Sequence, residues 1–170
     1  MNDLVDLVIS QWTRECPAQD FAAMSVVTRV FRLNALAARN VNRSFRNYDL
    51  HQGEFDVLAT LYRSGAPYAL NPQKLVEALL LTSGAMTNRL DRLEQAGLLT
   101  RSPNPEDRRG VIVSLTAEGL RVIKLVLKDY LKDLNELLDP LSASERKQLA
   151  GLLKKLLIKQ DQETPGGIGS

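Results

Sequence analysis

The sequence predicts a mainly α-helical fold that carries one small β-hairpin. Aromatic residues make up only 5% of the 170 residues while 44% are hydrophobic, a composition that favours helices over a β-sandwich. Apolar residues recur at spacings of three and four along several segments, which is the period of a helix with one buried face. Two short β-prone runs on either side of a polar loop supply the hairpin.

Three helices are expected before residue 64. The first ends ahead of the Cys16-Pro17 pair, because proline cannot continue a helix. Its apolar face consists of Leu4, Val5, Val8 and Trp12. A long second helix covers 21–48, and a third runs from about 51 to 63 after a break at residues 49 and 50.

Two short helices with a tight link follow. Asn71-Pro72 is a good start for the first, expected over 72–81, because asparagine caps helix N-termini and proline favours the first helical position. A turn at Thr82-Ser83-Gly84 leads into the second, 83–95, which Gly97 stops. Two helices joined so tightly form the helix-turn-helix pattern.

The two β-prone runs come directly afterwards, at 98–101 and 111–115, and enclose the polar loop 102–110. They predict a β-hairpin, and a hairpin directly after a helix-turn-helix is a wing. The sequence therefore predicts a winged helix-turn-helix lobe.

Two long helices close the chain, one capped by Thr116 and one opened by a capping box from Ser142 to Glu145. Their apolar stripes, Leu120 to Leu138 and Leu149 to Leu157, exceed what one small core can cover. We therefore expect them to pack across a two-fold axis in an intertwined homodimer.

These expectations divide one chain of residues 1–160 into two functional parts. The DNA-binding lobe is residues 50–116. The dimerisation helices are residues 1–48 and 117–160. The tail, 161–170, is expected to be disordered, as polar chain ends with Pro and Gly commonly are.

One face of helix 83–95 carries the chemistry that base edges accept. Leu90 and Leu93 lie within about 40° of Met86, so these three residues attach the helix to the core. The opposite half offers hydroxyls, an amide and a guanidinium to the major groove of duplex DNA. The predicted DNA contacts here are Thr82, Ser83, Thr87, Asn88 and Arg92.

The wing tip carries Arg108 and Arg109, and a guanidinium there can enter the narrow, electronegative minor groove. Asp107 is expected to brace one of them and leave the other pointing outward. The alternative is that both are ordinary surface arginines.

A second basic feature lies between Phe21 and Tyr48, where five arginines occur without an acid. At about 100° per helical residue they fall within about 100° of one another and form one stripe. A stripe of one sign indicates an anionic neighbour such as phosphate, and a solvated face is the alternative. The five are Arg29, Arg32, Arg39, Arg43 and Arg46.

Composition narrows the remaining function classes. No apolar run approaches the ~20 residues of a membrane span, and Asp3 and Asp6 occupy positions where a signal peptide would be positive, so we expect a cytoplasmic protein without a membrane partner. One cysteine and one histidine, Cys16 and His51, cannot build a tetrahedral zinc site, and no metal or other cofactor is expected.

An enzyme is not expected, because the chain has a lone histidine, no Gly-rich phosphate loop and no spaced pair of carboxylates. An architectural DNA protein without an effector is a further alternative. Such a protein would bind DNA regardless of sequence and would not release it in response to a ligand.

Two stretches, 82–97 and 104–116, resemble the MarR family of bacterial regulators. The Asp-Arg-Arg-Gly wing followed by Val-Ser-Leu-Thr is the specific part, and the likeness covers roughly 21–159. The resemblance implies a triangular homodimer with intertwined terminal helices, and repression released by a small molecule or an oxidant. In that family the wing arginine matching Arg109 enters the minor groove.

The segment 55–68, together with an extra N-terminal helix, resembles the urate-responsive, PecS-like branch of that family. The resemblance implies that four residues respond to the ligand: Trp12, Asp56, Arg89 and Arg101. Guanidinium, carboxylate and indole suit the charge, the donors and the flat ring of urate.

The residues themselves support part of this assignment. Arg89 lies about 60° from the core-facing Met86, so it points towards the protein body and away from the DNA face. The alternative is structural: Trp12 attaches the extra helix, and Asp56 and Arg89 form an ion pair that ties the recognition helix to the scaffold.

Oxidation of Cys16 is the second candidate signal, because some members of the family sense peroxide through a cysteine near this position. The surrounding Arg14-Glu15-Cys16-Pro17 lacks the apolar helical context of those sensors. Arg14 favours a thiolate and Glu15 opposes it.

Overall fold

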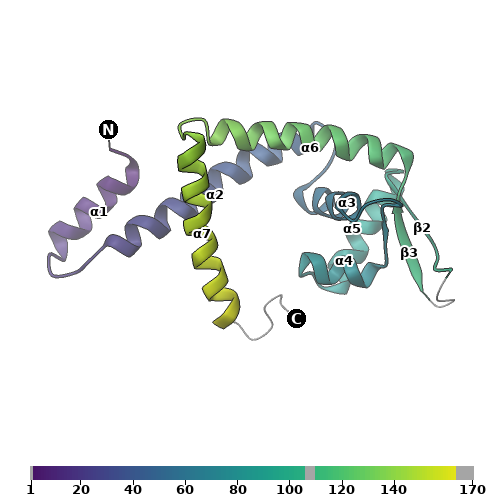
Figure 1. Ribbon diagram of the computed structural model, residues 1–170, viewed down its shortest axis with the longest axis horizontal. Coiled ribbons are helices and arrows are strands. Elements are labelled where there is room, and N and C mark those ends of the chain that lie inside the picture. Colours follow the sequence, from purple (N-terminus) through teal and green to yellow (C-terminus); the bar gives the residue numbers. More distant parts are fainter. Residues whose placement is uncertain (1, 106–109, 164–170) are drawn as a thin grey trace. The chain divides into compact units, whose positions relative to one another are not determined.

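The computed structural model of the chain describes residues 2–105 and 110–163 (Figure 1). It confirms the mainly α-helical fold with a small antiparallel sheet. The elements are α1 (Leu4–Glu15), α2 (Ala22–Arg46), α3 (Gln52–Arg63), β1 (Ala69–Leu70), α4 (Pro72–Leu79), α5 (Ser83–Gln95), β2 (Leu99–Pro103), β3 (Val111–Leu115), α6 (Ala117–Leu137) and α7 (Ala143–Glu163). No helix in the described ranges is long and apolar enough to cross a membrane.

Side-chain caps fix where α4, α5 and α6 begin. Asn71 Oδ1 accepts from the Lys74 N–H at 2.8 Å, and Thr82 Oγ1 accepts from the Ala85 N–H at 3.3 Å. Thr116 Oγ1 accepts from the Gly119 N–H at 2.9 Å at the start of α6. Each contact satisfies a backbone donor that has no partner inside its helix, and the three starts lie where the sequence predicts them.

The helix-turn-helix consists of α4 and α5, with a tight turn between them. The first helix ends two residues earlier than expected, at Leu79, because Leu80 adopts a left-handed conformation with φ of +50°. The second covers Ser83–Gln95, as predicted.

The sheet has the strand order β1-β3-β2, and both pairings are antiparallel. Leu99 faces Leu115 and Pro103 faces Val111, which builds the predicted hairpin, and Figure 1 shows it extending from the bundle of α3, α4 and α5. The third strand, β1, pairs with β3 and was not predicted. Two residues are too few to show a periodic pattern.

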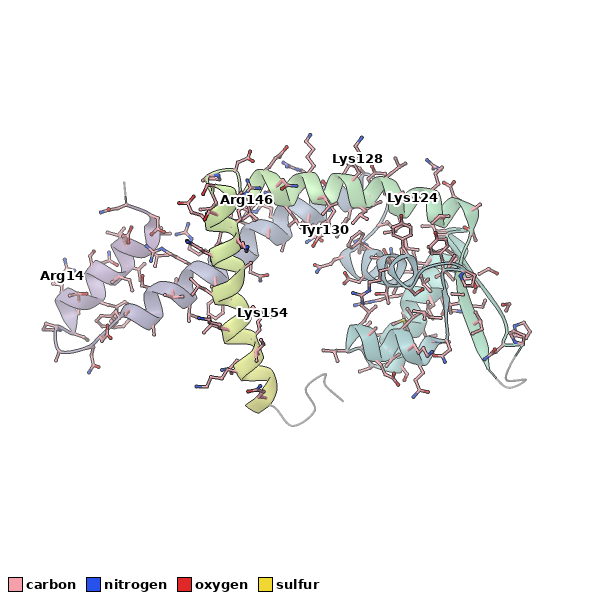
Figure 2. The ribbon with its side chains drawn as sticks, in the orientation of Figure 1. Arg14, Lys124, Lys128, Tyr130, Arg146 and Lys154 are labelled. Carbon is pink, nitrogen blue, oxygen red and sulfur yellow. The ribbon has the colours of Figure 1, made fainter. Side chains whose placement is uncertain are left out.

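An aromatic cluster joins α3 to the long helices α2 and α6. The ring of Phe45 on α2 lies 4.5 Å from Phe55 on α3, and Tyr130 on α6 lies 5.1 Å from Phe55. In Figure 2 Tyr130 lies on the side of α6 facing these helices, while Lys124 and Lys128 project from the outer side. The cluster makes α2, α3 and α6 one support for the lobe.

Hydrogen bonds reinforce this support. The hydroxyl of Tyr48 donates to Asp129 Oδ2 at 2.6 Å, and Ser44 Oγ donates to the carboxylate of Asp133. The bond to Asp129 raises the pKa of Tyr48 above its ordinary value.

The helix α1 packs on α2 through one stack and one ionic cluster. Trp12 stacks on Phe21 with ring centroids 6.2 Å apart. The guanidinium of Arg29 binds Asp3 at 3.0 and 3.1 Å and Asp6 at 2.6 Å. The first member of the arginine stripe therefore faces acids of its own chain, where the sequence indicated phosphate.

The C-terminal helix belongs to a separate compact unit. The chain divides into Met1–Asp133 and Leu134–Ser170, and in the second unit Ser142 and Glu145 form the predicted capping box. This helix continues to Glu163, so our prediction of a disordered tail from 161 is wrong for three residues. Glutamine and glutamate favour helices, which suits the extension of α7 to Glu163. Residues 164–170 lie outside the described ranges.

A glycine lets α6 begin against the turn that follows α5. A Cβ on Gly119 would lie 1.8 Å from the carbonyl oxygen of Leu98, a backbone atom that cannot rotate away. We predict that Gly119→Ala lowers the free energy of unfolding by about 1–3 kcal/mol in urea titrations. Gly151→Ala is the control, because nothing lies within 4 Å of its Cβ, and an equal loss there would contradict the close approach.

Candidate nucleic-acid interface and effector site

The recognition helix α5 has one buried and one polar face. Met86, Leu90 and Leu93 are 1%, 3% and 1% exposed, which confirms the predicted core side. The polar residues at its start and on its opposite face are exposed: Thr82, Ser83, Thr87 and Asn88.

The hydroxyls of Thr82 and Thr87 make hydrogen bonds within the helix, whereas the side-chain amide of Asn88 does not. Thr82 caps the helix, and the Thr87 hydroxyl donates to the Ser83 carbonyl at 3.0 Å. Within the described residues no hydrogen bond engages the side chain of Asn88. Its amide is therefore free to offer both a donor and an acceptor to a base pair.

Of the wing, the structure describes the two paired strands, β2 and β3, and residues 104, 105 and 110. Asp107, Arg108 and Arg109 lie outside the described residues, so the predicted minor-groove contact remains a prediction.

Arg92, which we expected to face DNA, binds the scaffold. Its Nε lies 3.0 Å from Glu54 Oε1, and the Glu54 side chain is only 6% exposed. The other carboxylate oxygen accepts from the His51 N–H at 2.7 Å. A buried carboxylate needs such partners, and so Arg92 ties α5 to the first turn of α3. The Arg92 side chain is 56% exposed.

Arg101, which we expected to bind a ligand, joins the wing to the recognition helix. Its Nη1 lies 2.6 Å from Asp91 Oδ1 and 3.3 Å from Glu94 Oε2. The backbone N–H of Arg101 also donates to Glu94 Oε1 at 3.0 Å. The Asp91 carboxylate is therefore bound by this arginine.

Arg89 and Asp56 do not form the predicted ion pair. Arg89 points towards the protein body, as expected, but its Nη1 donates to the Gly53 carbonyl at 3.4 Å. Among the described residues no hydrogen bond or ion pair engages the Asp56 carboxylate. Burial raises the pKa of Asp56 above its ordinary value, and the charges of Arg89 and Arg63 offset part of that rise. The prediction misjudged the partner because a backbone carbonyl leaves no signal in the sequence.

Contacts among the described residues do not link all four predicted ligand residues. Asp56 and Arg89 lie close enough to interact electrostatically. Trp12 is 46% exposed and stacks on Phe21, and no hydrogen bond, ion pair or ring contact among the described residues links it to the other three.

A hollow between α4 and α5 was not predicted. It has a volume of about 600 Å³ and a mainly apolar lining that includes Val76, Met86 and Leu90. Thr87 and Arg101 add a hydroxyl and a guanidinium to its wall. The spacing of apolar residues on each helix was visible in the sequence, but the gap between them depends on the angle at which the helices pack.

The thiol of Cys16 is free and partly buried at the end of α1. The neighbouring Arg14 binds Glu15 at 3.0 Å, so these two charges satisfy one another. No cluster of metal-ligating side chains occurs in the described ranges.

Known proteins resemble the chain over most of its length. A family model described as the MarR family matches residues 50–111. The HTH-type transcriptional regulator PecS of Dickeya dadantii is 40% identical over 149 residues, which are 88% of this chain and 90% of that protein. The multiple antibiotic resistance protein MarR of Escherichia coli is 35% identical over 129 residues, 75% of this chain and 88% of that protein.

Solved structures agree with these matches. The crystal structure of a mutant MarR from Escherichia coli complexed with operator DNA has a TM-score of 0.68 at 29% identity. The match covers 92% of this chain and 99% of that one. The wild-type apo form from the same organism has a TM-score of 0.66 at 33% identity, over 76% of this chain and 94% of that one.

The buried contact between Glu54 and Arg92 generates a prediction about the lobe. Glu54→Gln keeps the shape of the side chain but removes the charge that holds the guanidinium. We expect the free energy of unfolding to fall by about 1–3 kcal/mol in urea titrations. Glu118→Gln is the control, because its 2.6 Å pair with Arg121 is exposed, and it should have a smaller effect. Equal effects of the two substitutions would show that burial adds nothing to the Glu54 contact.

Proposed function

We propose that this chain, which belongs to the MarR family of DNA-binding transcriptional regulators, represses transcription as a homodimer on a palindromic operator. A small anionic molecule, urate above all, releases the DNA. The observation that carries the proposal is the polar, exposed face of α5 directly ahead of a wing. The named relatives are transcriptional regulators, not enzymes.

Exposed apolar side chains support a dimer. Such side chains occur on α1, α2 and α7, and large exposed apolar side chains in such number often mark a contact with another protein. They include Leu4, Leu7, Val27, Phe31, Leu152, Leu156 and Leu157. A second copy is the occupant that covers them, in an interface above ~2,000 Å² in total, as in obligate dimers.

Two copies related by a two-fold axis present two recognition helices to one face of the duplex. Half-sites about one helical turn apart follow from that symmetry. In each half-site the Asn88 amide reads a base edge, the hydroxyls of Thr82, Ser83 and Thr87 hold the backbone or bases, and Arg109 enters the minor groove beside Arg108.

The charges around α3 and α5 support an anionic effector. Arg89 belongs to the recognition helix, and the Asp56 carboxylate opposite has no direct partner among the described residues. An anion that binds Arg89 pulls on α5 and so shifts the helix away from its DNA-binding position. A coupling of about 1–3 kcal/mol would lower operator affinity by roughly 5–150-fold.

Two further residues take part in the proposed response. Arg101 lines the hollow between α4 and α5 and is bound to Asp91, so an anion there would compete for it. The indole of Trp12 is 46% exposed in the single chain and is the group that stacks on a flat ring in the dimer.

Base reading by α5 is tested with operator variants. We predict that Asn88→Ala relaxes the preference at one base step, at a cost of about 1–3 kcal/mol, in fluorescence-anisotropy titrations with duplexes recovered by in vitro selection. Gln95→Ala, at the exposed end of the same helix, is the control. Arg109→Ala should instead weaken all duplexes alike and reduce the salt slope by about one.

Two outcomes would contradict this part of the proposal. One is that Asn88→Ala and Arg109→Ala both lose affinity uniformly across the duplexes. The other is that light scattering at micromolar concentration shows a monomer, which would remove the palindromic operator as well.

The effector is tested through Trp12, the only tryptophan in the chain. We predict that urate changes its fluorescence and lowers operator affinity, and that Trp12→Phe weakens urate binding more than it weakens DNA binding. If millimolar urate changes neither signal, urate is excluded. Peroxide, acting by oxidation of Cys16, is then the next effector to test.

A further inference from the structure

Arg89 and Asp56 carry opposite charges in neighbouring, partly buried positions and yet are not paired. Asp56 lies on α3 with its pKa raised by burial, and Arg89 on α5 is close enough to offset part of that rise. An ion pair would satisfy both groups. Something in the local structure therefore favours a different position for the guanidinium.

The first turn of α3 provides that position. A Cβ on Gly53 would lie 2.5 Å from Arg89 Cζ, 2.6 Å from Nε and 2.8 Å from Nη2. The fourth contact is the 3.4 Å hydrogen bond from Arg89 Nη1 to the Gly53 carbonyl. The guanidinium thus occupies the space that the side chain of any other residue would fill.

The surroundings leave few other positions for this group. Glu54, the next residue, is already bound by Arg92 and by the His51 N–H. Asp56 is three residues from Gly53 and so lies on the same side of α3. If the guanidinium leaves Gly53, the Asp56 carboxylate is the acid that can receive it.

We propose that Gly53 is a positioning residue for the effector response: because it lacks a side chain, Arg89 rests on the backbone of α3 and leaves the Asp56 carboxylate unpaired. The two charges then remain available to an anionic heterocycle that has both acceptors and donors, Arg89 for its acceptors and Asp56 for its N–H groups. This inference rests on the proposed effector site. It also gives a reason for a glycine inside a helix, where glycine is less favourable than alanine.

Substituting Gly53 tests this directly. The atoms that a new Cβ would meet belong to the end of a flexible side chain, so Gly53→Ala should fold and displace only Arg89. We expect the displaced guanidinium to pair with Asp56 and lower the titration midpoint of its carboxyl, followed by ¹³C NMR. In an Arg89→Ala background the same glycine substitution should leave the Asp56 midpoint unchanged.

Two control variants separate the effect of Gly53 from a general effect of adding a methyl group or removing the guanidinium. Gly151→Ala places the same methyl group in open space on α7 and should not move the Asp56 midpoint. Arg89→Ala alone leaves α3 intact and should raise that midpoint. The proposal is overturned if Gly53→Ala leaves the midpoint unchanged, or if it shifts the midpoint equally with and without Arg89.

The effector arm uses urate as the probe. We expect Gly53→Ala to weaken the effect of urate on DNA binding by at least about fivefold, because Arg89 is then paired. A variant that keeps the full urate response while Asp56 is paired would overturn the role of Gly53 in that response. If wild-type protein ignores urate, the proposed effector fails, whereas the Asp56 titration still decides whether Gly53 positions Arg89.

Discussion

The contact between the first turn of α3 and α5 is the constraint on which the orientation of the polar face of α5 depends. Glu54 is almost fully buried, and a carboxylate in that position must keep its partners, so Arg92 holds α5 in place. From the other side Arg101 binds Asp91 and joins the wing to the same helix. Ionic contacts from two directions thus set the orientation of the face that carries Asn88.

This arrangement suits a regulator better than apolar packing alone. Met86 and its apolar neighbours keep α5 on the core, and the ionic contacts of Arg92 and Arg101 add directional constraints on its orientation. A ligand with differential affinity for two orientations can shift the population between them. The unpaired charges of Arg89 and Asp56 lie where such a ligand would act on the helix most directly.

Much of the fold follows from the sequence, because helix caps and apolar spacing are local signals. The buried and exposed faces of α5 and its bounds were predictable from residues 82–97 alone. The ionic partners were not. Gly53, Glu54 and Asp56 are close in sequence, as are Arg89 and Arg92, and only the packing of α3 against α5 decides which groups meet. The two-residue strand β1 likewise exists only through its pairing with β3.

The central claim is that the effector releases DNA by moving α5 relative to the rest of the dimer. Electron–electron spin distances test it most directly, with a nitroxide on Gln95→Cys in a Cys16→Ser background. The account predicts one distance between the two copies without ligand and a shift of about 2 Å or more when urate binds. A distance distribution that urate leaves unchanged while operator affinity falls would contradict the account.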